Sequence, residues 1–394
     1  MDEKKYGLTV KIAVLTLAAM LYTTSMTTPA LGEIAKAFPN VSPTVVKQIS
    51  TIPSLMMIIF SLVPGQLERF ISKKSVIYLA LILSFMGILP AFFGGMTLIL
   101  VSRILFGAGH GMLFPYAASM IAYLFEGEER NALMGYKTSV GAVSGIVFQM
   151  LGGILAMYSW RYAFLGFLLI IPSCLMIMFM LPEPEKKSNT AEKVVSKGKV
   201  SINTYIIAVL NMLLNVLTFS FMTNVSIVMV SGKVGNAAQA GFVLTLFTVG
   251  SFIASMMYGR IISKIFKKFT IVLAVGLYGL SFLLLVSVNT YSMFCVAGII
   301  YGLGFGTFNP EIVIKVIKSS PAPAAISTGI LFALQGLGQF LSPFVLTAIT
   351  KMLRISSVKA AWNVSAVCVL GAAIILCLVL AFGKSEKPPF TEAK

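Results

Sequence analysis

Twelve apolar segments, each long enough to cross a lipid bilayer, constrain the fold of this chain more than any other feature. A transmembrane helix needs roughly 20 consecutive, mostly apolar residues. The twelve segments cover approximately residues 9–31, 46–66, 75–94, 97–124, 133–156, 162–182, 204–230, 238–260, 269–288, 291–316, 325–350 and 361–383. They are too long for barrel strands, and open strands would leave backbone groups unpaired in lipid. The sequence therefore predicts an all-α membrane protein with twelve transmembrane helices.

The composition also points to a lipid bilayer as the surroundings of this chain. Hydrophobic residues make up 58% of the sequence and charged residues 11%, whereas an average soluble domain is about 25% charged. So few charges could not cover the core of a globular protein of 394 residues. These values exclude a soluble globular protein, a disordered chain and a nucleic-acid-binding domain.

The basic residues indicate how the chain is oriented in the membrane. There are 30 Lys and Arg against 13 Asp and Glu, which gives a formal charge of +17. With the N-terminus placed inside, 22 basic residues fall on the inner side, seven fall on the outer side, and Arg103 falls within the fourth segment. Inner loops carry an excess of Lys and Arg. We therefore predict that both termini are cytoplasmic and that no nucleic acid is bound.

A glycine-rich pattern occurs once in each half of the chain. Phe106–Gly111 reads Phe-Gly-Ala-Gly-His-Gly and is followed by Pro115, and Tyr301–Gly306 reads Tyr-Gly-Leu-Gly-Phe-Gly and is followed by Pro310. Every matched position is offset by 195 residues. Glycines at this spacing let another helix backbone approach closely. We interpret the two patterns as equivalent packing surfaces of an internal repeat.

A second repeated pattern lies in two basic loops. Gly65 precedes Lys73–Lys74, and Gly259 precedes Lys267–Lys268, at an offset of 194 residues. Two independent matches at nearly the same offset predict two equivalent six-helix halves. The predicted division is an N-terminal bundle at 1–182, a cytoplasmic linker at 183–203 and a C-terminal bundle at 204–394.

These features together resemble the major facilitator superfamily. The family's loop motif reads Gly-x-Leu-Ala-Asp-Arg-x-Gly-Arg-Lys, and here Gly65, Leu67 and Lys73–Lys74 fit it. Arg69 occupies the acidic position of the motif, so Glu68 has to supply the acid of the family's charge relay.

Two further family motifs are matched in part. Arg103 and Gly107 fit the fourth-span motif Arg-x-x-x-Gly, whose arginine is implicated in coupling in proton-driven relatives. Gly152 and Gly153 keep only the last glycines of the drug antiporters' fifth-span motif, Gly-Pro-x-x-Gly-Gly. The resemblance implies two bundles that rock around a central site, in a bacterial cytoplasmic (inner) membrane.

Ionisable residues within the spans are the first candidates for the site, because charge in a membrane is costly and mostly functional. Arg103 is a candidate for anion binding or coupling, and His110, the only histidine, is a candidate for substrate binding. Glu311 is the only carboxylate well inside a span. Lys315 follows it by four residues, which favours an ion pair on one helix face. We therefore assign Glu311 and Lys315 to coupling or gating.

Uncharged polar residues complete the predicted site. In the family the first, fourth, seventh and tenth spans line the central cavity, flanked by the fifth, eighth and eleventh. The further candidates for substrate binding on these spans are Tyr22, Tyr116, Gln149, Asn215, Asn309, Gln335 and Gln339. Gln335 and Gln339 are one helical turn apart and share a face.

The sequence thus predicts a secondary active transporter of a small organic solute. The charges within the spans are mainly basic, which favours an anionic or zwitterionic solute. The alternative is a proton-coupled exporter of drugs or sugars. Coupling to H⁺ or to Na⁺ stays open. We expect a monomer without a cofactor. We also expect no metal site, because the four cysteines fall within spans as packing residues. We expect no enzyme, because there is no nucleotide-binding loop and no paired catalytic base.

Overall fold

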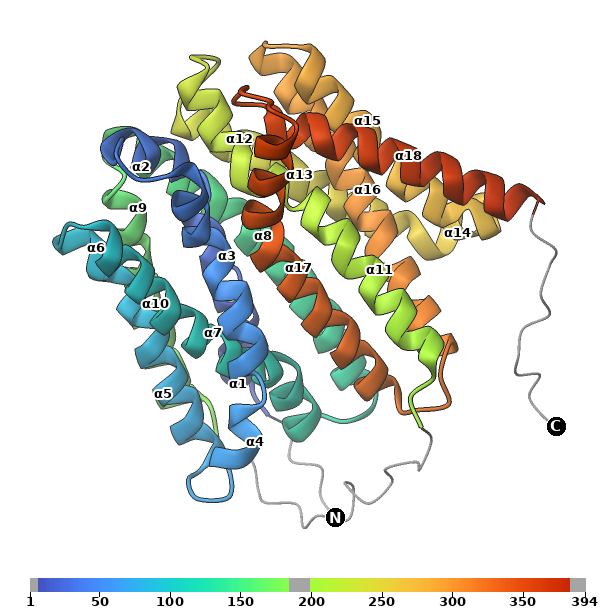
Figure 1. Ribbon diagram of the computed structural model, residues 1–394. Coiled ribbons are helices and arrows are strands. Elements are labelled where there is room, and N and C mark those ends of the chain that lie inside the picture. Colours follow the sequence, from blue (N-terminus) through green and yellow to red (C-terminus); the bar gives the residue numbers. More distant parts are fainter. Residues whose placement is uncertain (1–5, 184–198, 383–394) are drawn as a thin grey trace.

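Two helical bundles, one from each half of the chain, lie side by side (Figure 1). The computed structural model describes residues 6–183 and 199–382, so most of the predicted linker at 183–203 lies outside the described residues. The first bundle consists of α1 (Leu8–Met20), α2 (Leu31–Ala37), α3 (Pro43–Phe60), α4 (Val63–Leu67), α5 (Lys73–Phe85), α6 (Leu89–Phe92), α7 (Met96–Leu124), α8 (Gly127–Tyr158), α9 (Tyr162–Leu165) and α10 (Ile170–Met180). The second consists of α11 (Ile202–Thr218), α12 (Ser220–Ser231), α13 (Ala237–Met257), α14 (Ser263–Phe266), α15 (Thr270–Ser287), α16 (Tyr291–Lys318), α17 (Ala324–Met352) and α18 (Ala360–Phe382).

The long helices account for the apolar segments of the sequence. In the described part of the chain, ten helical stretches are long and apolar enough to cross a membrane. One of them, Ala237–Ser287, contains both α13 and α15, and the chain turns between them at Lys267, where φ is 45°. The shorter apolar helix α1 begins one more crossing. The all-α membrane fold predicted from the apolar segments is confirmed.

The first apolar segment is not one continuous helix, and on this point the predicted span 9–31 was wrong. Helix α1 ends at Met20, a short 3₁₀ turn covers Thr23–Met26, and α2 begins at Leu31. The hydroxyl of Thr23 donates to the carbonyl oxygen of Met20 at 2.8 Å. Pro29 has no N–H for an α-helical bond. Hydroxyl side chains that bond to the nearby backbone compete with the regular helix, and the break leaves Tyr22 at the middle of this crossing.

The glycines of α7 bring it close to two neighbouring helices. A Cβ atom at Gly107 would lie 2.7 Å from the Cα of Pro53 in α3. At Gly109 it would lie 2.3 Å from the carbonyl oxygen of Ala80 in α5. No side chain larger than hydrogen fits at such distances, so these glycines set how closely the helices pack.

The second half repeats this arrangement at equivalent positions. A Cβ atom at Gly302 of α16 would lie 2.2 Å from the carbonyl oxygen of Phe247 in α13, and one at Gly304 would lie 3.0 Å from that of Ala274 in α15. The contacted residues are offset from those in the first half by 194 residues, as the motifs are by 195. The glycine patterns therefore have the same packing role in both bundles.

The loop lysines also have equivalent positions. The Nζ atom of Lys74 donates to the carbonyl oxygen of Met178 at 2.8 Å, near the end of α10. The Nζ atom of Lys268 donates to that of Leu380 at 2.8 Å, near the end of α18. Each basic loop thus binds the last helix of its own bundle at its C-terminal end, where the helix dipole favours a cation.

Candidate functional site

The two bundles meet mainly along three helix pairs, α2 with α12, α3 with α17, and α8 with α13, and α3 also touches α12. We call this contact surface the seam. One end of the molecule, where α1 begins and α11 follows the linker, is called the linker end; the other is called the outer end, since the charge distribution predicts it to face outward.

The seam is closed at the outer end by polar contacts. The backbone N–H of Gly32 in α2 donates to the hydroxyl of Ser226 in α12 at 2.9 Å, and that hydroxyl donates to the carbonyl oxygen of Pro29. The hydroxyls of Thr44 in α3 and Thr347 in α17 are 2.9 Å apart. The two bundles are therefore held together at this end.

Halfway along the seam, uncharged polar side chains of both bundles meet. The hydroxyl of Thr248 in α13 donates to Oε1 of Gln149 in α8 at 3.0 Å. The ring of Tyr22 lies over Gly141 and Gly145, and a Cβ atom at Gly145 would also lie 3.7 Å from a methyl group of Thr248. The structure thus brings together the predicted residues Tyr22 and Gln149. Thr248 was missed from the sequence, which offers no pattern that distinguishes it from other threonines within spans.

A second group of amides joins α11 to α17 within the second bundle. Asn215 donates from Nδ2 to Oδ1 of Asn211 at 3.1 Å, and Asn211 donates from Nδ2 to Oε1 of Gln335 at 3.4 Å. The next residue, Gly336, packs against Ile58 of α3 across the seam. The structure brings together the predicted residues Asn215 and Gln335 beside the seam, with Gln339 one turn further along α17.

Arg103 does not lie at the seam but inside the first bundle. Its side chain is fully buried, and Nη2 donates to the carbonyl oxygen of Gly87 at 3.2 Å. The guanidinium carbon lies 4.7, 5.3 and 4.8 Å from the ring centres of Phe106, Phe164 and Phe167. Such rings attract a cation through their faces. Nε and Nη1 have no partner among the described residues.

His110 is also enclosed by the first bundle. It is 5% exposed, and its ring centre is 5.2 Å from that of Phe106, one of the rings around Arg103. The structure therefore places His110 in the same interior as Arg103. Asn309 donates from Nδ2 to the carbonyl oxygen of Phe305 on its own helix at 3.3 Å, and within the described part of the chain it has no hydrogen bond to another candidate residue.

The ion pair that the sequence spacing indicated is present near the linker end. Nζ of Lys315 lies 3.2 Å from Oε1 of Glu311. The other carboxylate oxygen accepts a hydrogen bond from the hydroxyl of Tyr258 at 2.6 Å. Both oxygens of Glu311 are therefore satisfied within the second bundle. Tyr258 was missed, although it directly precedes Gly259 of the second basic loop.

The first bundle also contains a hydrogen bond between a tyrosine and a carboxylate near the linker end. The hydroxyl of Tyr116 in α7 donates to Oε1 of Glu68 at 2.7 Å, and Nζ of Lys73 lies 3.6 Å from Oε2 of Glu68. Tyr116 of α7 and Glu311 of α16 occupy equivalent positions, since they are offset by 195 residues. The long helix therefore carries the tyrosine in the first half and the carboxylate in the second. Tyr116 therefore lies at the linker end of its bundle. Arg69 is exposed, and Glu68 supplies the acid beside the loop lysine.

Solved structures of transporters share this fold. The chain superposes on the nucleoside transporter NupG with a TM-score of 0.74 at 13% identity, covering 95% of this chain and all of NupG. It superposes on a D-xylose–proton symporter with a TM-score of 0.67 at 14% identity, covering 94% of this chain and 97% of the symporter. At such low identity the likeness concerns the fold alone.

Curated relatives are similar in sequence over large parts of the chain. A probable sugar efflux transporter of Helicobacter pylori (strain G27) is 22% identical over 339 residues, which cover 83% of this chain and 84% of the relative. The multidrug efflux pump SdrM of Staphylococcus aureus (strain N315) is 24% identical over 246 residues, which cover 58% of this chain. The chain spans about half the length of SdrM, since the match covers 54% of it.

The sequence profile described as Major Facilitator Superfamily matches the chain at residues 13–232 and again at 204–394. The two matches together extend over both bundles and agree with the fold of the solved transporters. The protein is therefore a multi-pass membrane transporter and not an enzyme, and it belongs to the Major Facilitator Superfamily.

Proposed function

We propose that this transporter exports a small, neutral, hydroxyl-rich solute of the sugar class by alternating access. The observation that carries the proposal is the uncharged polar contact between Gln149 and Thr248 at the middle of the seam, with Tyr22 beside it. Amide and hydroxyl groups both donate and accept hydrogen bonds, so they match the hydroxyls of a sugar. Because each bundle contributes one partner, a solute that replaces this contact would bridge both bundles.

The placement of the charges supports a neutral solute over the anionic or zwitterionic one expected from the sequence. Arg103 and His110 lie inside the first bundle. Glu311 and Lys315 pair with each other near the linker end. Charges that lie inside one bundle, away from the seam, contribute little to recognition at the seam. Export is proposed because the two curated relatives described above are efflux proteins by name.

We assign Glu311 and Lys315 to gating rather than to proton coupling. Both carboxylate oxygens of Glu311 already have partners within the second bundle, Lys315 and Tyr258, so the side chain is fixed in place there. The pair lies near the linker end of α16, which predicts that it fixes this end of the second bundle while the bundles move. Transport of the solute would then persist in Glu311→Gln with an unchanged response to a pH gradient.

An organic anion is the second candidate for the solute, and one observation favours it. Nε and Nη1 of Arg103 have no partner among the described residues, so the guanidinium retains two donor positions for an anion. An anion can reach Arg103 only if the first bundle opens between α7 and its neighbours, because the side chain is fully buried. This second candidate predicts that Arg103→Gln abolishes transport of carboxylates.

Reconstitution into vesicles tests the two candidates against each other. The purified protein is assayed with a panel of sugars and carboxylates, with and without a pH or Na⁺ gradient. Under the proposal, sugar flux is saturable and falls at least about tenfold in Gln149→Leu and Thr248→Val, which corresponds to about 1.4 kcal/mol. Thr138→Val is the matched control, because that hydroxyl donates to Met134 on its own helix at 3.3 Å. Carboxylate flux without sugar flux would refute the sugar proposal.

A further inference from the structure

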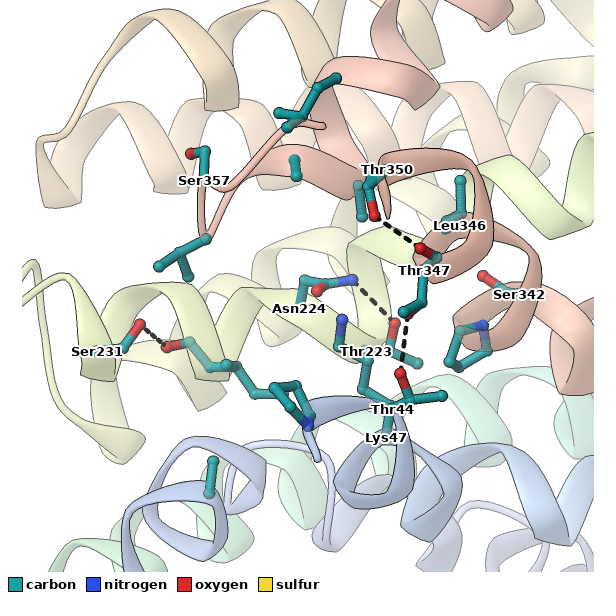
Figure 2. A pocket seen from close by; sticks show the side chains of 18 of the residues that line it. Thr44, Lys47, Thr223, Asn224, Ser231, Ser342, Leu346, Thr347, Thr350 and Ser357 are labelled. Atoms are coloured by element: carbon teal, nitrogen blue, oxygen red, sulfur yellow. Dashed lines mark hydrogen bonds between the residues drawn. The ribbon is translucent and has the colours of Figure 1, made fainter. Parts of the chain in front are cut away.

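A cavity of about 450 Å³ lies between the two bundles at the outer end (Figure 2). Its walls come from α2 and α3 of the first bundle and from α12, α17 and the start of α18 in the second. Pockets for small molecules commonly measure about 300–1,000 Å³. We call this cavity the outer pocket. It is separate from the polar contacts at the middle of the seam, since neither Gln149 nor Thr248 lines it.

The outer pocket carries an unpaired positive charge. Lys47 of α3 lines it, and no carboxylate of the described residues lies within ion-pair distance of its ammonium group. Lys36 also lines the pocket, but its Nζ lies 3.5 Å from Oε1 of Glu33. No Asp or Glu is among the described residues that line the pocket. The potential inside is therefore positive.

Two helix termini add to this potential. The N-terminal residues of α3, Pro43 and Thr44, and those of α18, Ala360 and Ala361, line the outer pocket. The N-terminus of a helix carries a partial positive charge and favours an anion. The helices α12 and α17 end near the pocket with the opposite polarity. Their last turns are closed by backbone hydrogen bonds, such as that from Ile355 to Thr350 at 2.9 Å.

The pocket also holds a buried polar atom without a partner. The Ser342 side chain is fully buried and lines the pocket, and its Oγ has no hydrogen-bond partner among the described residues. A buried hydroxyl without a partner costs free energy. Thr347 and Asn224 present further polar groups to the same space, as Figure 2 shows. The pocket thus offers a cation, two helix N-termini and an unsatisfied hydroxyl to a single ligand.

We propose that the outer pocket binds a small hydroxylated organic anion from the outer side, with its carboxylate at Lys47. Because the walls belong to both bundles, the anion holds them together at this end. Alternating access requires the bundles to separate here. A ligand that binds only the closed arrangement shifts the population toward it. The outer pocket is therefore an inhibitory site for the outward-opening step. This goes beyond the proposed sugar export and does not depend on which solute is carried.

Binding of gluconate to the purified full-length protein tests the proposal directly. Gluconate carries one carboxylate and several hydroxyls, and calorimetry in detergent measures its dissociation constant. We expect saturable binding that weakens at least tenfold in Lys47→Gln and less than threefold in Lys47→Arg, which keeps the charge. Lys351→Gln is the matched control, because this exposed lysine at the outer end does not line the pocket. Ser342→Ala provides a second variant that leaves Lys47 in place, and it should weaken binding about threefold.

The effect on conformation is measured by cysteine labelling. Ala237→Cys, in a protein whose four native cysteines are replaced by alanine, introduces a thiol that is buried in the seam at the outer end. An impermeant maleimide added from outside reacts with it only when the bundles separate. If gluconate binds only the closed arrangement, ten times its dissociation constant slows labelling about elevenfold.

Three results would overturn the proposal. The first is the absence of saturable binding by gluconate, and the second is binding that Lys47→Gln and Ser342→Ala both leave unchanged. The third is a labelling rate that is unchanged or faster with gluconate bound. Failure of sugar transport in vesicles would leave all three measurements valid, so the two proposals can be refuted separately.

Discussion

Replacing Gly109 with alanine should destabilise the first bundle, because no space exists for the added methyl group. Its Cβ would lie 2.3 Å from the carbonyl oxygen of Ala80, 2.5 Å from the backbone nitrogen of Ser84 and 2.6 Å from the hydroxyl of Ser84. Two of these atoms are backbone, so a side-chain rotation cannot relieve the contact. Helices α5 and α7 must therefore move apart by about 0.7 Å to restore even a 3.0 Å contact.

The size of the effect follows from that separation. A gap of 0.5–1 Å loses roughly a quarter to a half of the dispersion energy of each contact along the interface. Overpacking of this kind costs typically about 1–3 kcal/mol. Alanine regains up to about 1 kcal/mol because it favours the helix more than glycine does. We therefore expect Gly109→Ala to lower the free energy of unfolding by about 1–2 kcal/mol.

The repeat supplies matched controls for this experiment. At the equivalent position Gly304, a Cβ would lie 3.0 Å from the carbonyl oxygen of Ala274, so Gly304→Ala should be milder. At Gly276 of α15 nothing lies within 4 Å, and Gly276→Ala should stabilise by up to about 1 kcal/mol. The midpoint temperature of unfolding in detergent should rise in the order Gly109→Ala, Gly304→Ala, wild type, Gly276→Ala. The packing argument fails if Gly109→Ala unfolds at or above the wild-type temperature.

Three further variants test individual contacts. Tyr258→Phe removes the donor to Glu311 and should cost about 1–3 kcal/mol, measured as a lower unfolding temperature; an unchanged temperature would contradict the bond's contribution. Lys359→Met leaves three carbonyl groups at the end of α15 without their donor, so amide exchange of the last turn of α15 should accelerate, while α5 serves as the unchanged reference. Ser226→Ala removes the acceptor for Gly32 and should speed labelling of the Ala237→Cys seam thiol from outside; a slower rate would be inconsistent with closure by this contact.

Much of the fold could be predicted because its features depend on short stretches of sequence. The apolar segments specify helices long enough for the bilayer, since backbone groups in lipid have to be satisfied within each helix. The two glycine patterns and the two basic loops specified the repeat, because close backbone approach requires glycine wherever it occurs. The exception was the first crossing, where Thr23 and Pro29 interrupt an otherwise apolar segment.

The candidate site could be predicted only in part. Glu311 and Lys315 form the ion pair that their spacing indicated, because partners four residues apart share a helix face whatever surrounds them. The position of Arg103 was not deducible in the same way. Its three aromatic neighbours include Phe164 and Phe167, whose contact with α7 depends on how the last crossing of the bundle packs.

The sequence by itself determined that this chain is a helical membrane protein of two equivalent halves, and it identified the glycine surfaces on which the helices pack. Tertiary structure alone decided which polar side chains face the seam, such as Gln149 and Thr248, and which lie inside a bundle, such as Arg103. The physical reason lies in the lipid. In water, the apolar face of a helix identifies its buried side. In a bilayer, the lipid-facing and protein-facing sides of a helix are similarly apolar. The sequence pattern therefore does not show which side of a helix faces the other bundle.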